Sequence, residues 1–256
     1  MRAAELFDVS GEVALITGGG TGIGLAIARV LAVNGAKVAI AGKDHGALEA
    51  AVGLLTDLGG EAIAIPIDVR QDEMIPSSFD SVETTWGPVT VLVNNAGVVH
   101  RDKAVHLTRE TIRDVMAVNV DGAVMMAQEA ARRMIRDGRG GSIINISSIL
   151  AGVPMRQVAA YSASKAALSQ MTRSLALEWA KHGIRVNEIR PGWFETTLTD
   201  RFLKGPGAHV MAGQNPLGRL GAPHDLDGAI LLLASKAGIY MTGSAITVDG
   251  GHSLGR

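Results

Sequence analysis

Short apolar segments alternate with longer segments of helical periodicity along almost the whole 256-residue chain. The apolar segments are rich in Val, Ile and Ala and lack strict apolar–polar alternation, which is typical of strands buried on both faces of a parallel sheet. Their alternation with helices predicts right-handed strand–helix–strand crossovers. We therefore expect an α/β fold of three layers, with a doubly wound parallel sheet and helices on both faces.

Strands are expected at 13–17, 37–41, 61–67, 89–94, 142–147, 184–190 and 245–248. Helices are expected from the glycine turn at 18–24 to Asn34, from the second strand to near Leu58, and over 72–86, 108–137, 158–182 and 223–235. The irregular segment 195–216 is long for a loop in a compact domain, and such loops often cover a binding site. The sequence predicts a single domain over 1–256 with a substrate lid at about 195–216.

Composition excludes several classes of function. The formal net charge is −1, so there is no electrostatic case for binding nucleic acid or an anionic membrane. No apolar run approaches the ~20 residues of a membrane-spanning helix. The chain has no cysteine, and its seven histidines are scattered without metal-ligand spacing, so we expect no disulfide and no metal. A cytoplasmic protein with a small-molecule substrate is the expected class.

A glycine-rich stretch, TGGGTGIG at 17–24, follows the first expected strand and opens the first helix. Its glycines would permit a tight turn and let a diphosphate approach backbone N–H groups at a helix amino terminus. The spacing is G-x-x-x-G-I-G, over Gly18, Gly22 and Gly24, and not the usual G-x-G-x-x-G of dinucleotide-binding turns. The alternative is a flexible strand-to-helix turn without a ligand.

A tyrosine stands four residues before a lysine in YSASKAALSQM at 161–171, so both side chains lie on one face of the expected helix. Free tyrosine has a pKa of about 10, and free lysine of about 10.4, so neither is a useful base alone at neutral pH. A nearby ammonium stabilises the phenolate. The pair is a candidate acid/base; the alternative is a buried tyrosine beside a lysine that reaches solvent from an ordinary amphipathic helix.

The motifs TGGGTGIG, NNAG at 94–97 and Ser148 with Tyr161 and Lys165 stand together in one order. They resemble the short-chain dehydrogenase/reductase family over nearly the whole chain, from Gly11 to the VDGG at 248–251. The resemblance implies a Rossmann-type fold that binds NAD or NADP beyond the carboxyl ends of the strands. It also implies a homotetramer, with dimers built from the long helices that carry Asn119 and Tyr161.

The resemblance implies the catalytic roles. Tyr161 would be the general acid/base, Ser148 the partner of the carbonyl oxygen, and Lys165 the residue that lowers the pKa of Tyr161 and holds the nicotinamide ribose. Ser148 is favoured over Ser147 because it precedes Tyr161 by the family spacing of 13 residues. Asn119 would order a water that leads protons past Lys165; its alternative role is a helix amide satisfied by backbone.

The resemblance also implies a coenzyme site, made of Gly18, Thr21, Gly22, Ile23, Gly24, Lys43, Asp68, Val69, Asn95, Ala96, Gly97, Tyr161, Lys165, Pro191, Gly192 and Thr196. NAD-preferring relatives carry an acidic residue at the end of the second strand, where this chain has Gly42 followed by Lys43. A cation without a carboxylate favours NADP(H) over NAD(H), because it suits a 2′-phosphate. Two residues weaken this preference: Thr21 stands where many NADP-dependent relatives carry a basic residue, and Asp44 is an acidic residue close by. Lys43 could also simply face solvent.

Substrate residues are expected at His100, Arg101, Leu150 and Trp193. NNAGVVHR and PGWFETTLT resemble the gluconate 5-dehydrogenase and 2-deoxy-gluconate dehydrogenase branch, and also the 3-oxoacyl-carrier-protein reductases. Arg101 near the pocket mouth could bind a sugar-acid carboxylate, although a salt bridge or a solvated position is its commoner role. A sugar acid or polyol is preferred to an oxoacyl thioester. A non-catalytic dinucleotide-binding sensor is the alternative of another class, and the retained Ser148, Tyr161 and Lys165 argue against it.

Overall fold

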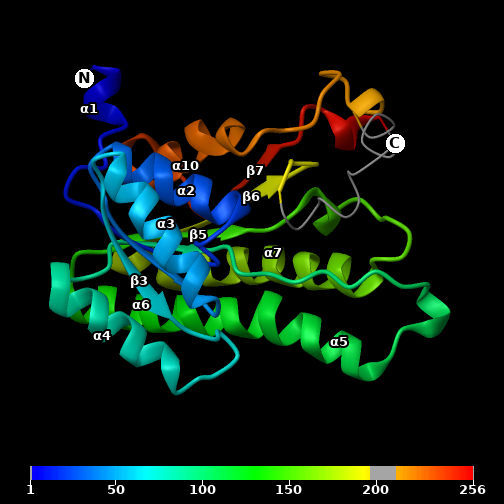
Figure 1. Cartoon of the computed structure of the whole chain (residues 1–256), viewed down its shortest axis with the longest axis horizontal. Coiled ribbons are helices and arrows are strands. Elements are labelled where there is room, and N and C mark those ends of the chain that lie inside the picture. The colour runs from blue at the N-terminus through cyan, green and yellow to red at the C-terminus, as the bar shows by residue number, and fades with distance from the viewer. Residues whose placement is uncertain (1, 197–211, 256) are drawn as a thin grey trace.

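The computed structural model describes residues 2–196 and 212–255, and its centre is a sheet of seven parallel strands (Figure 1). The strands are β1 (Val13–Thr17), β2 (Lys37–Gly42), β3 (Glu61–Pro66), β4 (Val91–Asn94), β5 (Gly141–Ile146), β6 (Ile184–Pro191) and β7 (Ala245–Val248). Their order in the sheet is β3-β2-β1-β4-β5-β6-β7. The predicted doubly wound α/β fold is confirmed, and the strand order reverses between β1 and β4.

Helices cover both faces of the sheet, which makes three layers (Figure 1). One layer contains α2 (Gly22–Val33), α3 (His45–Asp57) and α10 (Asp227–Ala234). The other contains α4 (Met74–Trp86), α5 (Arg109–Met116), α6 (Ala123–Asp137) and α7 (Ala159–Trp179). A short helix α1 (Ala3–Leu6) precedes β1. Single turns of 3-10 helix occupy Ala104–His106, Ile149–Ala151, Ala180–His182, Pro223–Leu226, Lys236–Gly238 and His252–Leu254.

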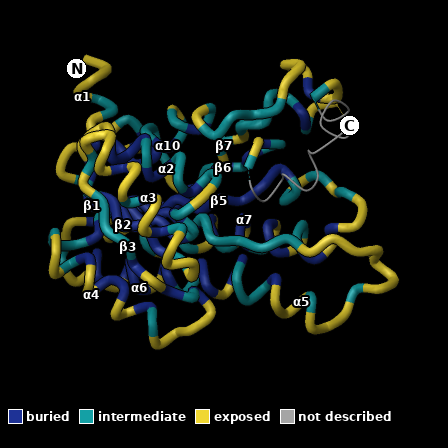
Figure 2. The backbone as a smooth tube through the Cα atoms, viewed as in Figure 1, coloured by how far each residue is buried: buried dark blue, intermediate teal, exposed yellow. Residues whose placement is uncertain are grey.

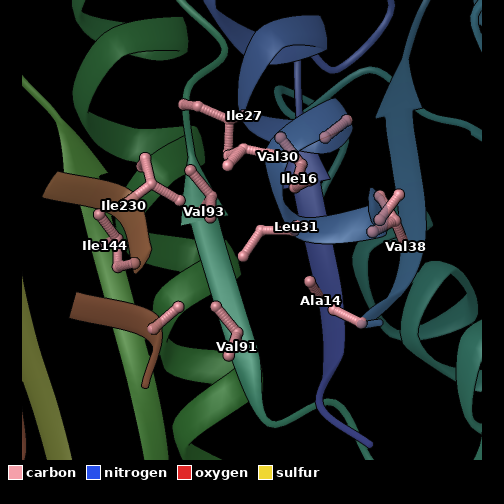
Figure 3. Packing of buried hydrophobic residues seen from close by; sticks show 14 of the residues in the cluster. Ala14, Ile16, Ile27, Val30, Leu31, Val38, Val91, Val93, Ile144 and Ile230 are labelled. Carbon is pink, nitrogen blue, oxygen red and sulfur yellow. The ribbon is translucent and has the colours of Figure 1, made fainter. Parts of the chain in front are cut away.

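The inner strands are buried, as the dark centre of the molecule in Figure 2 shows, and the edge strands β3 and β7 are only partly buried. Apolar side chains project from both faces of the sheet into two clusters. On one face, Val91 and Val93 of β4 pack under α2 and α10, beside Ile27, Leu31 and Ile230 (Figure 3). Burial on both faces explains why the strand sequences lack an apolar–polar alternation. No helix in the described ranges is long and apolar enough to cross a membrane.

The structure departs from the predicted elements in three helices, of which the one expected over 158–182 is α7 followed by a 3-10 turn at Ala180–His182. The helix expected over 108–137 is divided by a π-helical segment, Ala117–Gly122, which carries Asn119. Gly122 in this segment lies so close to the chain after β3 that a Cβ atom would be 2.8 Å from Val69 Cγ2. The helix expected over 223–235 is a 3-10 turn followed by α10. Most of the expected lid, residues 197–211, lies outside the described residues.

A buried cation joins α4 to α6. The Arg133 side chain is 8% exposed and pairs with Glu129 at 2.7 Å, with Asp80 at 2.8 Å and with Glu83 at 2.8 Å. Its guanidinium also lies 5.4 Å from the centroid of the Phe79 ring. Removing one partner of a buried ion pair is strongly destabilising, because the remaining charges stay poorly solvated.

We predict that Arg133→Met lowers the free energy of unfolding by about 3 kcal/mol, because Glu83 and Glu129 lose their shared buried cation. Urea unfolding followed by circular dichroism measures the change. Arg173→Met is the control, since Arg173 on α7 is exposed, bonds Gln170 and lies outside the cluster, and its effect should stay within about 0.5 kcal/mol. Equal effects of the two substitutions would contradict a structural role for the cluster.

Candidate active site

A cavity of about 440 Å³ opens at the carboxyl ends of β1, β4, β5 and β6, and we call it the central cavity. It lies beside the point where the strand order reverses, the usual ligand position in such sheets. Its lining is Gly18, Thr21, Gly22, Ile23, Gly24, Asn95, Ala96, Gly97, Ile146, Ser147, Ser148, Tyr161, Lys165, Pro191, Gly192, Phe194 and Thr196. The structure thus brings most of the predicted catalytic and coenzyme residues to one place.

The glycine turn is held by specific contacts rather than left flexible. Gly18 and Gly22 have φ values of 64° and 54°, a region that favours glycine. A Cβ on Gly24 would lie 2.1 Å from Gly18 O, so α2 can start here only with a glycine. The Asn95 side-chain amide donates to Thr17 O and Gly18 O at 3.0 Å each. The turn therefore presents bare backbone to the cavity in one fixed conformation.

Thr17, at the end of β1, is a supporting residue that the sequence analysis missed. Its Oγ1 atom accepts hydrogen bonds from the backbone N–H groups of Asn95, at 3.0 Å, and Ala96, at 3.1 Å. Thr17 is 2% exposed. A buried threonine has no motif of its own. Only its position, as the last residue of β1 directly before the glycines, could have indicated this role.

Tyr161 is half-buried in the wall of the central cavity, which Ser148 also lines. Loss of solvation raises the pKa of Tyr161, and the interaction with the Ser148 side chain lowers it by less. The net direction is opposite to the lowering expected from Lys165. The reason is geometric, since Lys165 Nζ lies 5.7 Å from the centroid of the Tyr161 ring and donates to Ile146 O at 2.8 Å.

Lys165 is only 4% exposed, and its ammonium group rests against the carboxyl end of β5. Burial lowers its pKa to about 8, because the charged form loses solvation, and the charge of Glu188 acts in the opposite direction. The ammonium is therefore the major form at neutral pH and is lost as the pH rises above about 8. Lys165 is held inside the site and does not reach solvent along an amphipathic helix.

The two neighbouring serines point to different partners. Ser148 Oγ accepts a hydrogen bond from Leu150 N at 3.1 Å and contacts Tyr161. Ser147 Oγ donates to Lys165 O at 3.2 Å and lies 3.1 Å from Ser169 Oγ. Successive residues of an extended segment project to opposite sides, which explains the divergence. Ser148 is thus the serine whose side chain acts on the pKa of Tyr161.

Asn119 does not line the central cavity. Its Oδ1 atom accepts from Val98 N at 2.8 Å, and its Nδ2 atom donates to Val98 O at 3.0 Å and to Ser164 Oγ at 2.9 Å. A Cβ on Gly97 would lie 3.4 Å from Asn119 Oδ1 and 3.6 Å from Lys165 Nζ, so these two side chains flank Gly97. The contacts observed are those of the backbone-satisfied alternative, and a role in ordering water stays a prediction.

Lys43, Asp68 and Val69 also lie outside the cavity lining. Asp68 binds Arg70 at 2.6 Å, and Lys43 Nζ lies 4.0 Å from the same carboxylate. The Arg70 guanidinium holds the pKa of Asp68 below its usual range. Val69 packs against Gly122. Arg70 is a second cation at this edge that the sequence analysis did not single out.

The predicted substrate residues are not gathered in one place. Arg101 Nε donates to Gln157 Oε1 at 2.7 Å, which joins the loop after β4 to the loop before α7. His100 is exposed and Leu150 is half-buried. Trp193 lines a separate cavity of about 200 Å³, and its ring stacks edge-on with His252 at 6.5 Å between centroids. Phe194, its neighbour, lines both cavities.

In residues 2–196 and 212–255, no group of three or more acidic or histidine side chains is arranged to hold a metal ion.

Comparisons with known proteins agree with this geometry. A family model described as Enoyl-(Acyl carrier protein) reductase matches residues 18–253. The chain is 33% identical to gluconate 5-dehydrogenase of Gluconobacter oxydans (strain 621H), over 99% of both chains. A crystal structure of a short-chain type dehydrogenase/reductase from Mycobacterium marinum is 38% identical, with a TM-score of 0.94 over 98% of this chain and 99% of that one.

A gluconate 5-dehydrogenase from Burkholderia cenocepacia J2315, solved in complex with NADP and tartrate, is 34% identical, with a TM-score of 0.94 over 99% of each chain. These matches span nearly the whole sequence, and the family resemblance inferred from the motifs is confirmed. With a doubly wound sheet and a glycine turn beside a Ser, Tyr and Lys cluster, the chain belongs to the short-chain dehydrogenase/reductase family of NAD(P)-dependent oxidoreductases.

Proposed function

We propose that this protein interconverts a secondary alcohol and a ketone on a sugar acid or polyol, with NADP(H) as coenzyme and Tyr161 as general acid/base. The observation that carries the proposal is that Ser148, Tyr161 and Lys165 line one cavity together with the glycine turn. The relatives named gluconate 5-dehydrogenase support the sugar-acid part.

The residues around the central cavity fit a dinucleotide. The glycine turn lines the cavity with backbone and is fixed, because a Cβ on Gly24 would clash with Gly18 O. The amino terminus of α2 adds favourable partial charge for a diphosphate. Gly18, Gly22 and Gly24 would hold the diphosphate, and Lys165 would hold the nicotinamide ribose. When bound, the nicotinamide supplies or accepts the hydride.

Tyr161 would move the proton. In reduction its phenol donates to the carbonyl oxygen, and in oxidation its phenolate accepts the alcohol proton. Ser148 would donate its hydroxyl hydrogen to the oxygen as negative charge develops there. The charged Lys165 side chain would stabilise the phenolate. Because the pKa of Lys165 is about 8, this stabilisation would be lost as the pH rises above that value.

The preference for NADP(H) is proposed from the end of β2. Gly42 ends the strand where a ribose-binding carboxylate would stand, and the Lys43 side chain that follows is 64% exposed. Arg70 adds a second cation beside Asp68. Asp44 is engaged as the N-cap of α3, which directs its carboxylate to that helix. The relative solved with NADP bound supports the same coenzyme.

A sugar-acid substrate is proposed from Arg101, a cation in the segment after β4. Its Nε atom is held by Gln157 Oε1. A guanidinium in a fixed orientation suits a planar carboxylate. The net charge of −1 gives no general basic surface for an acidic carrier protein, which disfavours an oxoacyl thioester on a carrier.

We predict turnover of 5-keto-D-gluconate, and a kcat/KM with NADPH at least about tenfold above that with NADH, equivalent to about 1.4 kcal/mol of transition-state binding. Initial rates of coenzyme oxidation on one purified sample measure both. Acetoacetyl-CoA is the comparison substrate. Turnover of the thioester alone would overturn the sugar-acid proposal, and a higher kcat/KM with NADH would overturn the coenzyme assignment.

We predict that Tyr161→Phe lowers kcat by about 10²–10⁴-fold, because the ring stays and only the transferable proton is lost. Coenzyme binding, followed by NADPH fluorescence, should change little. Tyr240→Phe is the matched control, since Tyr240 is the other tyrosine of the chain and is fully exposed. Turnover that survives Tyr161→Phe would show that another group carries the proton.

We also propose a homotetramer, with dimers built from the helices that carry Asn119 and Tyr161. Supporting it, these helices expose Ile112, Ile135 and Leu177 at 42%, 40% and 85% of their surface, and exposed apolar faces of this kind often pack against a partner. A cytoplasmic location stays a prediction from the sequence.

Light scattering should give a mass of about four times the 26.6 kDa of one chain. Leu177→Glu on α7 should shift the protein to smaller species, because it places a charge in an apolar interface. Leu54→Glu on α3, which is 45% exposed, is the control and should leave the mass unchanged. A monomeric wild-type protein would contradict the assembly.

A further inference from the structure

A buried carboxylate, Glu188, stands behind the active site and has no role in the reaction described above. Glu188 lies on β6 and is 2% exposed. Its Oε1 atom accepts from Arg190 Nε at 2.9 Å and from Arg190 Nη2 at 2.6 Å. Its Oε2 atom accepts from Ser169 Oγ at 2.5 Å. Both oxygens are therefore hydrogen-bonded, and one of them faces α7.

A chain of hydroxyl groups connects this carboxylate to the peptide of Lys165. Ser169 Oγ lies 3.1 Å from Ser147 Oγ, and Ser147 Oγ donates to Lys165 O at 3.2 Å. Ser147 and Ser169 are each 3% exposed, so water does not compete for these bonds. The carboxylate and the lysine are thus joined through two buried serines, one on each side of the interface between α7 and the sheet.

The carboxylate sets the direction of the hydrogen bonds. An ionised carboxylate only accepts, so Ser169 must give its single hydrogen to Glu188. Ser169 Oγ is then an acceptor toward Ser147, whose hydrogen is shared between Ser169 Oγ and Lys165 O. A neutral amide at position 188 would keep its oxygen toward Arg190 and reverse this direction, because its nitrogen can donate to Ser169.

The Glu188 carboxylate and the Lys165 ammonium also interact electrostatically across this interface. Burial disfavours the Lys165 ammonium, and Glu188 is the charged group that favours it. The charged groups that face the Glu188 carboxylate are Arg190 on its own strand and Lys165 on α7. The neighbouring strands β5 and β7 carry no charged residue, and the other charged residues of α7, Arg173 and Glu178, are exposed.

We propose that Glu188 is a positioning residue of the active site: through Ser169 and Ser147 it anchors the backbone of Lys165, and its buried carboxylate favours the charged form of the lysine side chain. The alternative is an ordinary buried ion pair, in which Glu188 and Arg190 serve only the packing of β6. The two differ in one measurable respect, since only the proposed role makes the charge of Lys165 depend on Glu188.

The first test measures the protonation of Lys165 directly. The chain has seven lysines, so protein labelled with ¹³C at lysine Cε gives few signals, and the Lys165 signal is the one absent from Lys165→Arg. In the wild type it should titrate near pH 8. Glu188→Gln should move the midpoint down by about one pH unit, because a nearby opposite charge is removed.

Two further variants separate a specific effect on Lys165 from a general loss of folded protein. Glu188→Met combined with Arg190→Met removes both charges and leaves no unpaired buried ion, which proteins usually tolerate, and it should also lower the midpoint. Ser142→Ala is the matched control. It removes a buried serine hydroxyl that donates to Leu233 O at 2.8 Å, far from the cavity lining, and should leave the midpoint unchanged.

A second arm measures kcat/KM against pH with the carbonyl substrate, and this arm rests on the proposed function. Loss of activity should begin at lower pH in Glu188→Gln, because the ammonium is lost earlier as the pH rises. An unchanged Lys165 midpoint in both charge variants would overturn the inference. A shifted midpoint with an unshifted activity profile would support the action of Glu188 on Lys165 and would instead overturn the catalytic role proposed for that ammonium.

Discussion

The pairing of β1 with β4 is the contact on which the site depends. It brings the glycine turn after β1 and the segment after β4, 78 residues apart in the chain, to the same edge of the sheet. Thr17 and Asn95 then bond the two segments to each other. Because parallel strands all end at one edge, the same pairing also fixes where the ends of β5 and β6 deliver Ser148 and Pro191.

Much of this could be predicted from the sequence, because the signals are local. Apolar runs gave the strands to within one or two residues, and the glycine turn and the Tyr161–Lys165 spacing marked the cavity wall. The π-helical segment at 117–122 could not be predicted from the apolar periodicity, and Gly122 within it lies against Val69, a contact between distant parts of the chain. The hydrogen bond between Arg101 and Gln157 joins two loops that are far apart in the chain, so it could not be predicted either.

The direction of the pKa shift at Tyr161 could not be predicted from the spacing of Tyr161 and Lys165. Four residues on a helix place Tyr161 and Lys165 on one face, but they do not determine where the ammonium points. In the structure it turns to Ile146 O, and burial then dominates the pKa of both groups. A positively charged neighbour lowers the pKa of a phenol, whereas desolvation raises it. Only the three-dimensional structure shows which of the two effects is larger.

Buried hydrogen bonds join α7 to the sheet. Asn145 of β5 donates to Thr172 at 2.8 Å, Ser147 donates to Lys165 O at 3.2 Å, and Glu188 accepts from Ser169. Apolar side chains would stabilise the helix on the sheet equally well, but they would allow it to slide or rotate by small amounts. Hydrogen bonds inside a low-dielectric interior are satisfied in one register only. Such an interface fixes the height of Tyr161 and Lys165 above the strand ends, which a proton transfer over hydrogen-bond distance requires.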